Sequence, residues 1–154
     1  SYKLPIVRIR PFNHIGPRQS PSFVVAAFAK KIAEIEKNKI PPVIKVGNLS
    51  PKRDFTDVRD TVWGYQLLLE KGEPGEVYNI GSGRSYEIKY ILDTLLSFSD
   101  KKIAIETDSA LMRPVDVPEL ICDNSKIKKQ TGWEPKIPIE QTLQETLNYW
   151  RSQV

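Results

Sequence analysis

The amino-acid sequence predicts a mixed α/β fold in which short strands alternate with longer helices along 154 residues. One observation is the apolar run over 4–9, whose β-branched residues are typical of a buried parallel strand. A second is apolar spacing of three and four residues over 24–37 and over 139–150, which predicts amphipathic helices. A chain of this length can form one compact domain.

Two polar segments separate the predicted elements of the first half. A proline-rich loop is expected over 11–19, and Ser20 or Ser22 is expected to cap the helix that follows. After a short strand over 43–46, the segment 50–56 is expected to be a second polar loop.

The next helix is expected to begin after Thr56 or Asp57 and to end at Gly72. Its predicted apolar face contains Val58, Val62, Tyr65 and Leu69.

The second half is expected to supply three more strands and three more helices. The strands are expected at 77–80, 102–107 and 120–121. The helices are expected to begin near Ser85, Ser125 and Pro138.

The opening strand indicates that these residues belong to a larger fold. No turn or helix precedes it to cover its faces, and a strand of a parallel sheet needs neighbours. We therefore expect a fragment of a longer protein.

Composition excludes several classes of function. The single cysteine, Cys122, excludes an intramolecular disulfide and agrees with a reducing cytoplasm. The net charge of +4 does not predict a nucleic-acid partner, because basic and acidic residues are interspersed apart from the short cluster over 126–129. No stretch approaches the roughly 20 apolar residues of a membrane span, so no membrane partner is expected. One histidine and one cysteine also argue against a zinc site.

Polar groups that could bind a ligand occur in three predicted loops. Asn13 and His14 follow the first strand, Arg53 precedes a helix, and Arg113 lies with Asp116 in a late loop. Two arginines suit bidentate capture of a diphosphate, and an asparagine offers a donor and an acceptor to a sugar hydroxyl. The alternative is that each arginine forms a surface ion pair, and spacing alone does not bring the loops together.

No catalytic constellation is present in the sequence. The glycines over 81–83 follow a strand but lack the third glycine and the acidic ribose partner of a dinucleotide loop, so a tight turn is expected. No tyrosine precedes a lysine by four residues. The chain alone therefore lacks the residues for hydride transfer.

Five segments together resemble the extended short-chain dehydrogenase/reductase family, also called the NAD-dependent epimerase/dehydratase family. They are RPFNHIGPRQ (10–19), KRDFTDVRD (52–60), GEVYNIGSG (75–83), RPVD (113–116) and a closing stretch with Gly132-Trp133 and Pro135. The resemblance implies the C-terminal portion of a Rossmann-type extended member, with the last sheet strands and a small mixed α/β substrate-binding lobe.

The resemblance also implies how the C-terminal fragment 1–154 is divided. Segments 4–12 and 76–98 would belong to the cofactor-binding sheet layer, and 13–75 with 99–154 would form the substrate-binding lobe. Family members carry the glycine-rich loop and the Tyr-x-x-x-Lys pair upstream. NAD or NADP would therefore be bound mainly by the missing N-terminal part, and no catalytic residue can be named.

Two sets of site residues are implied by the family. Those expected beside the nicotinamide are Pro11, Phe12 and His14. Those expected to bind substrate are Asn13 for the sugar or its phosphate, Arg53 and Arg113 for the diphosphate and ribose, and Phe55 and Asp116 as orienting groups. The alternative for Phe55 is packing, and for Asp116 an ion pair.

Within the family, the loop over 11–17 is most similar to GDP-4-keto-6-deoxy-mannose reductases. GDP-mannose 4,6-dehydratases are close, but their arginine at the position of Gln19 is missing here. The expected ligand is a nucleoside-diphosphate sugar, bound by a homodimeric parent enzyme. A UDP-sugar 4-epimerase fragment and a non-catalytic nucleotide-sugar-binding module remain alternatives.

Overall fold

The computed structural model describes residues 4–112 and 117–154 and has the mixed α/β fold that the sequence predicts. The strands are β1 (Arg8–Pro11), β2 (Asn13–Ile15), β3 (Val43–Val46), β4 (Lys52–Asp57), β5 (Val77–Ile80), β6 (Ser85–Glu87), β7 (Ala104–Thr107) and β8 (Glu119–Leu120). The helices are α1 (Val24–Glu36), α2 (Val58–Lys71), α3 (Ile88–Ser97), α4 (Ser125–Thr131) and α5 (Ile139–Gln153), with a 3-10 turn, η1 (Ser109–Leu111).

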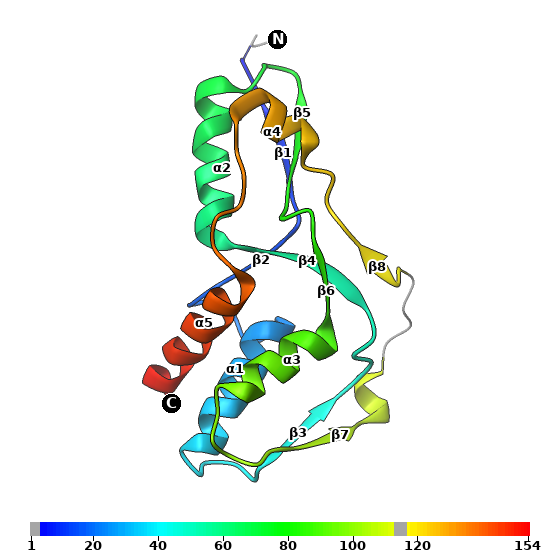
Figure 1. The fold of residues 1–154 in the computed structure, drawn as a ribbon, viewed down its shortest axis with the longest axis vertical. Coiled ribbons are helices and arrows are strands. Elements are labelled where there is room, and N and C mark those ends of the chain that lie inside the picture. Colours follow the sequence, from blue (N-terminus) through cyan, green and yellow to red (C-terminus); the bar gives the residue numbers. More distant parts are fainter. Residues whose placement is uncertain (1–3, 113–116) are drawn as a thin grey trace.

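The strands form three small sheets. β1 pairs in parallel with β5, and β3 pairs in parallel with β7. Between them, β4 pairs in parallel with β2 and β8 and antiparallel with β6. Figure 1 shows the β1–β5 pair with α2 and α4 at one end of the molecule, and α1, α3, α5 and the β3–β7 pair at the other.

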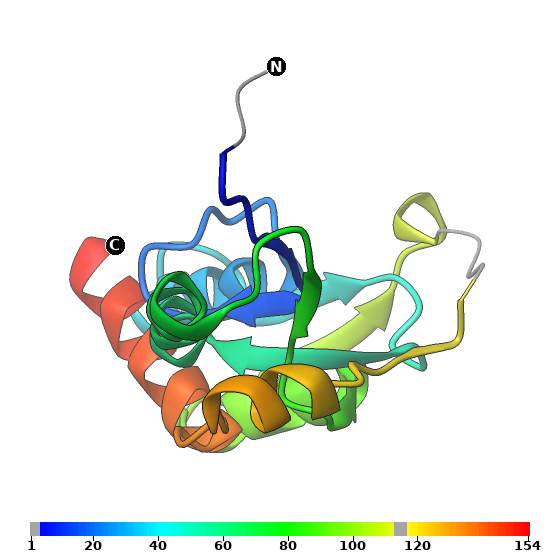
Figure 2. The same cartoon turned by 90° about the horizontal axis from the view of Figure 1, so that it is seen from above.

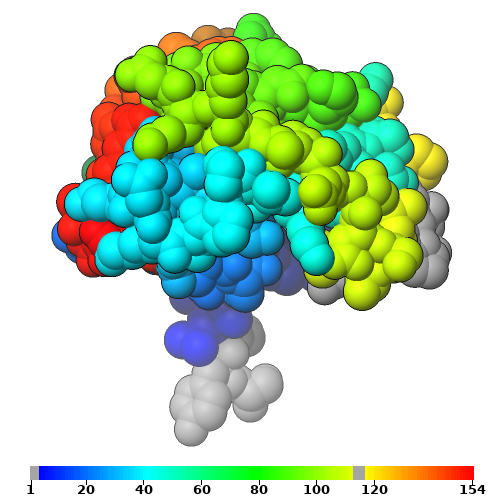
Figure 3. Space-filling model, turned by 90° about the horizontal axis from the view of Figure 1, so that it is seen from below, coloured from blue at the N-terminus to red at the C-terminus, as the bar shows by residue number. Residues whose placement is uncertain are grey.

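Each end has its own apolar core. The larger core joins α1, α3 and α5 and includes Ile15 and Phe55 from β2 and β4. The smaller core lies around β5, where Trp133 is fully buried beside Tyr78. Figure 2 shows α2 and α4 beside β5 at this end. The opposite end is covered by the segment around β3, which lies beside the segment around β7 in the space-filling view (Figure 3).

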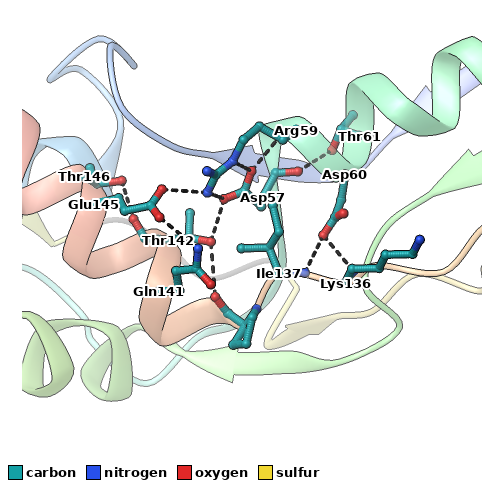
Figure 4. A network of polar contacts seen from close by, with 11 residues as sticks. Asp57, Arg59, Asp60, Thr61, Lys136, Ile137, Gln141, Thr142, Glu145 and Thr146 are labelled. Atoms are coloured by element: carbon teal, nitrogen blue, oxygen red, sulfur yellow. Dashed lines mark hydrogen bonds and ion pairs between the residues drawn. The ribbon is translucent and has the colours of Figure 1, made fainter.

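A polar network ties the start of α2 to α5 (Figure 4). The Asp57 carboxylate caps α2 and accepts a hydrogen bond from the Thr142 hydroxyl of α5 at 2.8 Å. One turn further, the Asp60 carboxylate accepts the backbone N–H groups of Lys136 and Ile137, each at 2.9 Å. These bonds fix the approach of the α5 segment to β4 and α2.

The first strand differs from its prediction. It is parallel, as expected, but it begins at Arg8 and its residues are mostly exposed, so the predicted burial of 4–9 is wrong. Leu4 and Ile6 are 67% and 57% exposed. The reason is that only one face of this segment is covered: Val7 and Ile9 pack against the smaller core, whereas Leu4, Ile6 and Arg8 are exposed.

The two predicted loops contain strands instead. β2 falls within 11–19, and β4 begins within 50–56 and ends at Asp57, because these polar segments pair with each other and with β6 and β8. Segment 85–87 likewise pairs as β6, so α3 begins at Ile88 rather than Ser85.

Neither predicted serine caps α1. The Ser22 N–H donates to the Ser20 hydroxyl at 3.3 Å, and Phe23 stands at the N-cap position without a side-chain hydrogen bond. Asp57 does cap α2, as one of the two predicted alternatives.

Helix α2 buries a different face from the predicted one, although Tyr65 of the predicted face is half-buried and packs against the smaller core. Val62 and Leu69 are 56% and 85% exposed, whereas Gly64 and Leu68 are buried. Gly64 explains the choice, since a Cβ there would lie 3.0 Å from Trp133 Nε1 and 3.1 Å from Ile80 Cδ1. The absence of a side chain lets this face approach β5 closely.

Packing groups the segments differently from the division inferred for ligand binding. α3 joins the larger core with α1 and α5, while α2 contacts α4 near the β1–β5 pair. The expected division is therefore a proposal about ligand binding and not a description of packing units. It assigns 4–12 and 76–98 to the cofactor-binding layer, and 13–75 and 99–154 to the substrate-binding lobe.

Candidate functional site

A pocket of about 540 Å³ opens where β1, β2 and α1 meet β4. It is lined by Pro11, Phe12, Asn13, His14, Ile15, Gln19, Phe23, Val24, Val25, Asn48, Pro51, Arg53, Phe55 and Ile88. Segments far apart in the sequence thus form one concave surface, which is the usual shape of a small-molecule site.

Strand pairing places the predicted residues beside one another. In the parallel ladder of β2 and β4, Asn13 is the partner of Phe55. The Phe12 N–H donates to the Ile80 carbonyl at 2.8 Å, which ties the start of this segment to the end of β5. The pocket therefore lies at the carboxyl end of the β1–β5 pair, where ligands of α/β folds commonly bind.

Arg53 supplies the charge of the pocket. Among the described lining residues it is the one with a permanent charge, and none of them is an aspartate or glutamate. One guanidinium nitrogen, Nη1, donates to the Lys52 carbonyl at 2.7 Å, which anchors the group on β4. The pocket is consequently suited to an anion, and Arg favours planar bidentate contacts with phosphate oxygens.

Other polar groups line the same pocket. The His14 ring nitrogen Nδ1 lies 3.1 Å from the Phe12 carbonyl, which can only accept, so Nδ1 carries the proton of this bond. The Gln19 amide nitrogen donates to the His14 carbonyl at 2.9 Å. Together with Asn13, these groups can hydrogen-bond sugar hydroxyls, while Phe12 and Phe23 supply apolar wall.

The first turn of α1 also faces the pocket. Phe23, Val24 and Val25 line it, and no side chain caps this helix. A helix N-terminus presents unpaired N–H groups and a partial positive charge. Its sign agrees with that of Arg53, so both features favour a phosphate-like group.

The pocket brings together most of the residues predicted from sequence. Pro11, Phe12, Asn13, His14, Arg53 and Phe55 all line it. Phe55 is only 5% exposed and also belongs to the larger core, so its side chain both packs in that core and lines the pocket. Arg113 and Asp116 lie outside the described residues, and their roles stay predictions.

Eight of the residues that line the pocket were not predicted as site residues, and the polar or aromatic ones among them are Gln19, Phe23 and Asn48. Gln19 entered the sequence analysis only in the comparison with dehydratases. Asn48 follows Gly47 after β3, and Phe23 precedes the first turn of α1. The polar residue at a strand end was a usable signal for Asn48, whose carboxamide oxygen accepts from the Ser50 N–H at 2.9 Å.

A second cavity of about 530 Å³ is lined by the turn over 82–84 and by residues 133–140. Its charges are mixed, because Glu134 and Glu140 lie in its wall with Lys128 and Lys136, and Lys128 pairs with Glu134. This cavity therefore lacks the uniform positive character of the first.

Within residues 4–112 and 117–154, no group of three or more His, Cys, Asp or Glu side chains is placed to hold a metal ion. No helix in these ranges has the length and apolar character needed to cross a membrane.

Comparison with known proteins identifies the family. A family model described as GDP-mannose 4,6 dehydratase matches residues 1–146. GDP-6-deoxy-D-mannose reductase from Pseudomonas aeruginosa is 37% identical over 145 residues, which are 94% of this chain and 48% of that protein. GDP-mannose 4,6 dehydratase 1 from Arabidopsis thaliana is 29% identical over 86% of this chain and 37% of its own length.

Solved structures agree with the sequence relatives. RMD from Pseudomonas aeruginosa, complexed with NADPH, has a TM-score of 0.92 at 35% identity, covering 97% of this chain and 50% of that one. UDP-glucose 4-epimerase from Thermotoga maritima, with UDP-glucose, has a TM-score of 0.78 at 32% identity, covering 96% and 46%. The chain thus spans half or less of the length of these proteins. The resemblance and the Rossmann-type fold predicted from sequence are confirmed, and the chain belongs to the GDP-mannose 4,6 dehydratase family.

Proposed function

We propose that this chain forms the nucleotide-sugar-binding part of an NAD(P)-dependent reductase or dehydratase. The substrate class is a GDP-6-deoxy-4-keto-hexose or GDP-mannose. The observation that carries the proposal is the convergence of Asn13 and Arg53 with Phe12 and His14 in one pocket without an aspartate or glutamate in its described wall. Relatives that act on GDP-linked sugars support this substrate class.

The pocket divides the ligand between its walls. Arg53 and the first turn of α1 hold the diphosphate, and Asn13 binds the sugar or the adjacent phosphate. Pro11 ends β1, and together with Phe12 and His14 it forms the wall proposed for the nicotinamide, which fits the flat apolar face of Phe12. NADH or NADPH supplies the hydride in enzymes of this class. The described residues contribute by holding the sugar carbonyl in a reactive position, which accounts for a large share of rate enhancement.

Hydride transfer needs residues that this sequence does not contain. No tyrosine stands four residues before a lysine, and 81–83 is a turn rather than a dinucleotide loop. We therefore assign binding and positioning to this chain, and no catalytic acid or base. A homodimeric parent enzyme and a cytoplasmic location stay predictions from sequence.

The proposal is tested by calorimetric titration of the protein with GDP-mannose and UDP-glucose. We expect binding of GDP-mannose and weaker binding of UDP-glucose. Preference for UDP-glucose would favour the UDP-sugar 4-epimerase alternative, which the Thermotoga maritima structure keeps as a second candidate. A folded protein that binds neither ligand would refute the nucleotide-sugar assignment.

Arg53→Ala tests the assignment of the phosphate group. Charged hydrogen bonds contribute about 1.5–3 kcal/mol, so we expect binding to weaken roughly 10- to 150-fold. Arg84→Ala is the matched control, because Arg84 is absent from the lining of this pocket and lines the second cavity. Equal weakening in both variants, or none in Arg53→Ala, would contradict the role of Arg53.

A further inference from the structure

A buried carboxylate lies at the centre of β4, beside the residues that line the pocket. Asp54 is 0% exposed and accepts four hydrogen bonds. Its Oδ1 accepts from the Ser82 N–H at 2.8 Å and the Ser82 hydroxyl at 2.6 Å. Its Oδ2 accepts from the N–H groups of Gly83 at 2.9 Å and Cys122 at 3.0 Å.

These four bonds join three segments that are distant in the sequence. Ser82 and Gly83 belong to the turn that follows β5, and Cys122 lies two residues beyond β8. Because β5 pairs with β1, the turn belongs to the same unit as Phe12. Asp54 therefore connects the strand that carries Arg53 to the strand pair that leads into the opposite wall of the pocket.

Strand alternation separates the two tasks of β4. Successive side chains of a strand point to opposite faces, so Arg53 and Phe55 share one face while Asp54 points to the other. Arg53 and Phe55 line the pocket, and Asp54 does not. The carboxylate thus anchors the strand from behind, and it leaves the pocket face free for ligand.

The hydrogen-bond donors to Asp54 make this anchor sensitive to the position of β4 relative to its neighbours. Among the described residues, no lysine or arginine forms an ion pair with it, and every partner is an N–H or O–H donor on a neighbouring segment. Hydrogen bonds to a carboxylate are shorter and stronger than hydrogen bonds between neutral groups. A buried carboxylate needs all of these bonds. A shift of β4 relative to the turn would break several at once.

Steric contact holds the same junction in one arrangement. A Cβ on Gly81 would lie 2.4 Å from Cys122 Cβ and 3.1 Å from Asp54 Oδ2, so no side chain fits there. The Asn124 amide nitrogen also donates to the Gly81 carbonyl at 2.9 Å. The turn, the Cys122 segment and β4 are therefore packed without space for an alternative register.

We propose that Asp54 is a positioning residue for the substrate. It sets the distance between the pocket-facing side chains of β4, Arg53 and Phe55, and the wall formed by Phe12 and His14. This role rests on the proposed function of the pocket. Without it, Arg53 would still hold the diphosphate, but the sugar would be displaced from the reacting position.

Asp54→Asn tests this role with little change in volume. The Asn amide nitrogen cannot accept, so one side of the carboxamide faces N–H donors and β4 shifts. In the full-length enzyme we expect kcat to fall at least tenfold and KM for the nucleotide sugar to rise about fivefold. Asp60→Asn is the matched control, since Asp60 is also a buried carboxylate that accepts backbone N–H groups and does not line the pocket. Its kcat and KM should remain within twofold of the wild type.

The outcomes separate positioning from general stability. Kinetics are measured at a temperature where circular dichroism shows each variant folded. Unchanged kcat and KM in folded Asp54→Asn, or an equal loss in Asp60→Asn, would overturn the proposal while leaving the nucleotide-sugar assignment intact. Absence of nucleotide-sugar binding in the wild type would instead refute the proposed function itself.

A milder variant covers the case in which Asp54→Asn does not fold. Ser82→Ala removes one of the four donors and keeps both N–H groups of the turn. We expect a two- to fivefold loss of kcat with normal secondary structure. Wild-type kcat in this variant would contradict the proposal.

Discussion

Replacing Asp57 by asparagine should remove about 2 kcal/mol from the free energy of unfolding at neutral pH. The Asp57 side chain is fully buried and accepts from the N–H, Nε and Nη2 groups of Arg59 at 2.8–2.9 Å, and from Thr142 at 2.8 Å. Asparagine keeps the N-cap of α2, because it caps as well as aspartate does. What it loses is the charge that strengthens the bonds to the guanidinium.

The magnitude follows from the exposure of the two partners. Breaking a fully buried ion pair costs about 3–5 kcal/mol, whereas exposed pairs contribute roughly 0–1 kcal/mol. Asp57 is buried, but Arg59 is 49% exposed and also pairs with Glu145 at 2.7 Å, which the variant retains. An intermediate loss of about 2 kcal/mol corresponds to a decrease in Tm of roughly 4–8 °C for a chain of this size.

The same effect should depend on pH. Burial by itself would raise the pKa of Asp57, but hydrogen bonds from Arg59 and Thr142 outweigh it and hold the pKa below its ordinary value of 3.8. A carboxyl whose pKa is lower in the folded state stabilises the fold above its unfolded pKa. This contribution is complete at neutral pH and is lost as pH falls below 3.8 through the folded pKa. The difference between wild type and Asp57→Asn should therefore shrink toward zero in acid.

Urea unfolding at pH 7 and at pH 3 measures this difference, with tryptophan fluorescence, to which the buried Trp133 contributes, and circular dichroism as probes. Asp93→Asn is the control, because its pair with Lys89 at 2.6 Å is more than half exposed on both sides. It should change the free energy of unfolding by less than about 0.5 kcal/mol. A loss below 0.5 kcal/mol in Asp57→Asn at pH 7, or a loss of equal size at both pH values, would refute the reasoning.

Two further predictions concern the junction behind β4. Gly81→Ala should destabilise the fold by at least about 2 kcal/mol, because its Cβ would overlap Cys122. Thermal unfolding measures this loss, and a variant with the wild-type Tm would contradict the close packing of Gly81 against Cys122. Burial, with a smaller effect of the Asp54 charge, raises the pKa of Cys122 to about 12. The native thiol should therefore resist a disulfide reagent at pH 8 and react when urea unfolds the protein; fast labelling of the native protein would show that Cys122 is accessible.

Elements with a local signal could be predicted from the sequence. α5 buries Ile139, Leu143 and Leu147, as their spacing indicates, and β3 and β5 occupy the predicted residues. In these segments the period of the apolar residues is sufficient to predict the element. One face packs against a core, whichever element that core belongs to.

β4 could not be predicted in the same way. Its residues are mostly polar, yet Asp54 and Asp57 are buried. Apart from Arg59, which pairs locally with Asp57, their hydrogen-bond partners include Ser82, Cys122 and Thr142, which lie 28 to 85 residues away. Local spacing contains no information on such partners, so a polar strand with distant donors resembles a loop. The buried face of α2 was missed for a similar reason, since the indole of Trp133 selects the side with Gly64.

The candidate site shows the same contrast between what local sequence predicts and what depends on distant residues. Residue type was enough to select Asn13, His14 and Arg53, because amide, imidazole and guanidinium groups suit a sugar diphosphate. Their convergence was not predictable, since it depends on parallel pairing between β2 and β4 across about 40 intervening residues. The resemblance to a family supplied that long-range information.

The two aspartates of β4 explain why the pocket can join two separate cores. The core around Trp133 is smaller than the core of α1, α3 and α5, so apolar packing holds the β1–β5 end less strongly. Asp54 binds the turn after β5, and Asp57 binds α5, which belongs to the larger core. β4 is thereby fixed to both ends by carboxylates, while Arg53, next to Asp54, faces the pocket. A ligand that contacts Arg53 and the wall after β1 would add a third connection, so binding and the alignment of the two ends should stabilise each other.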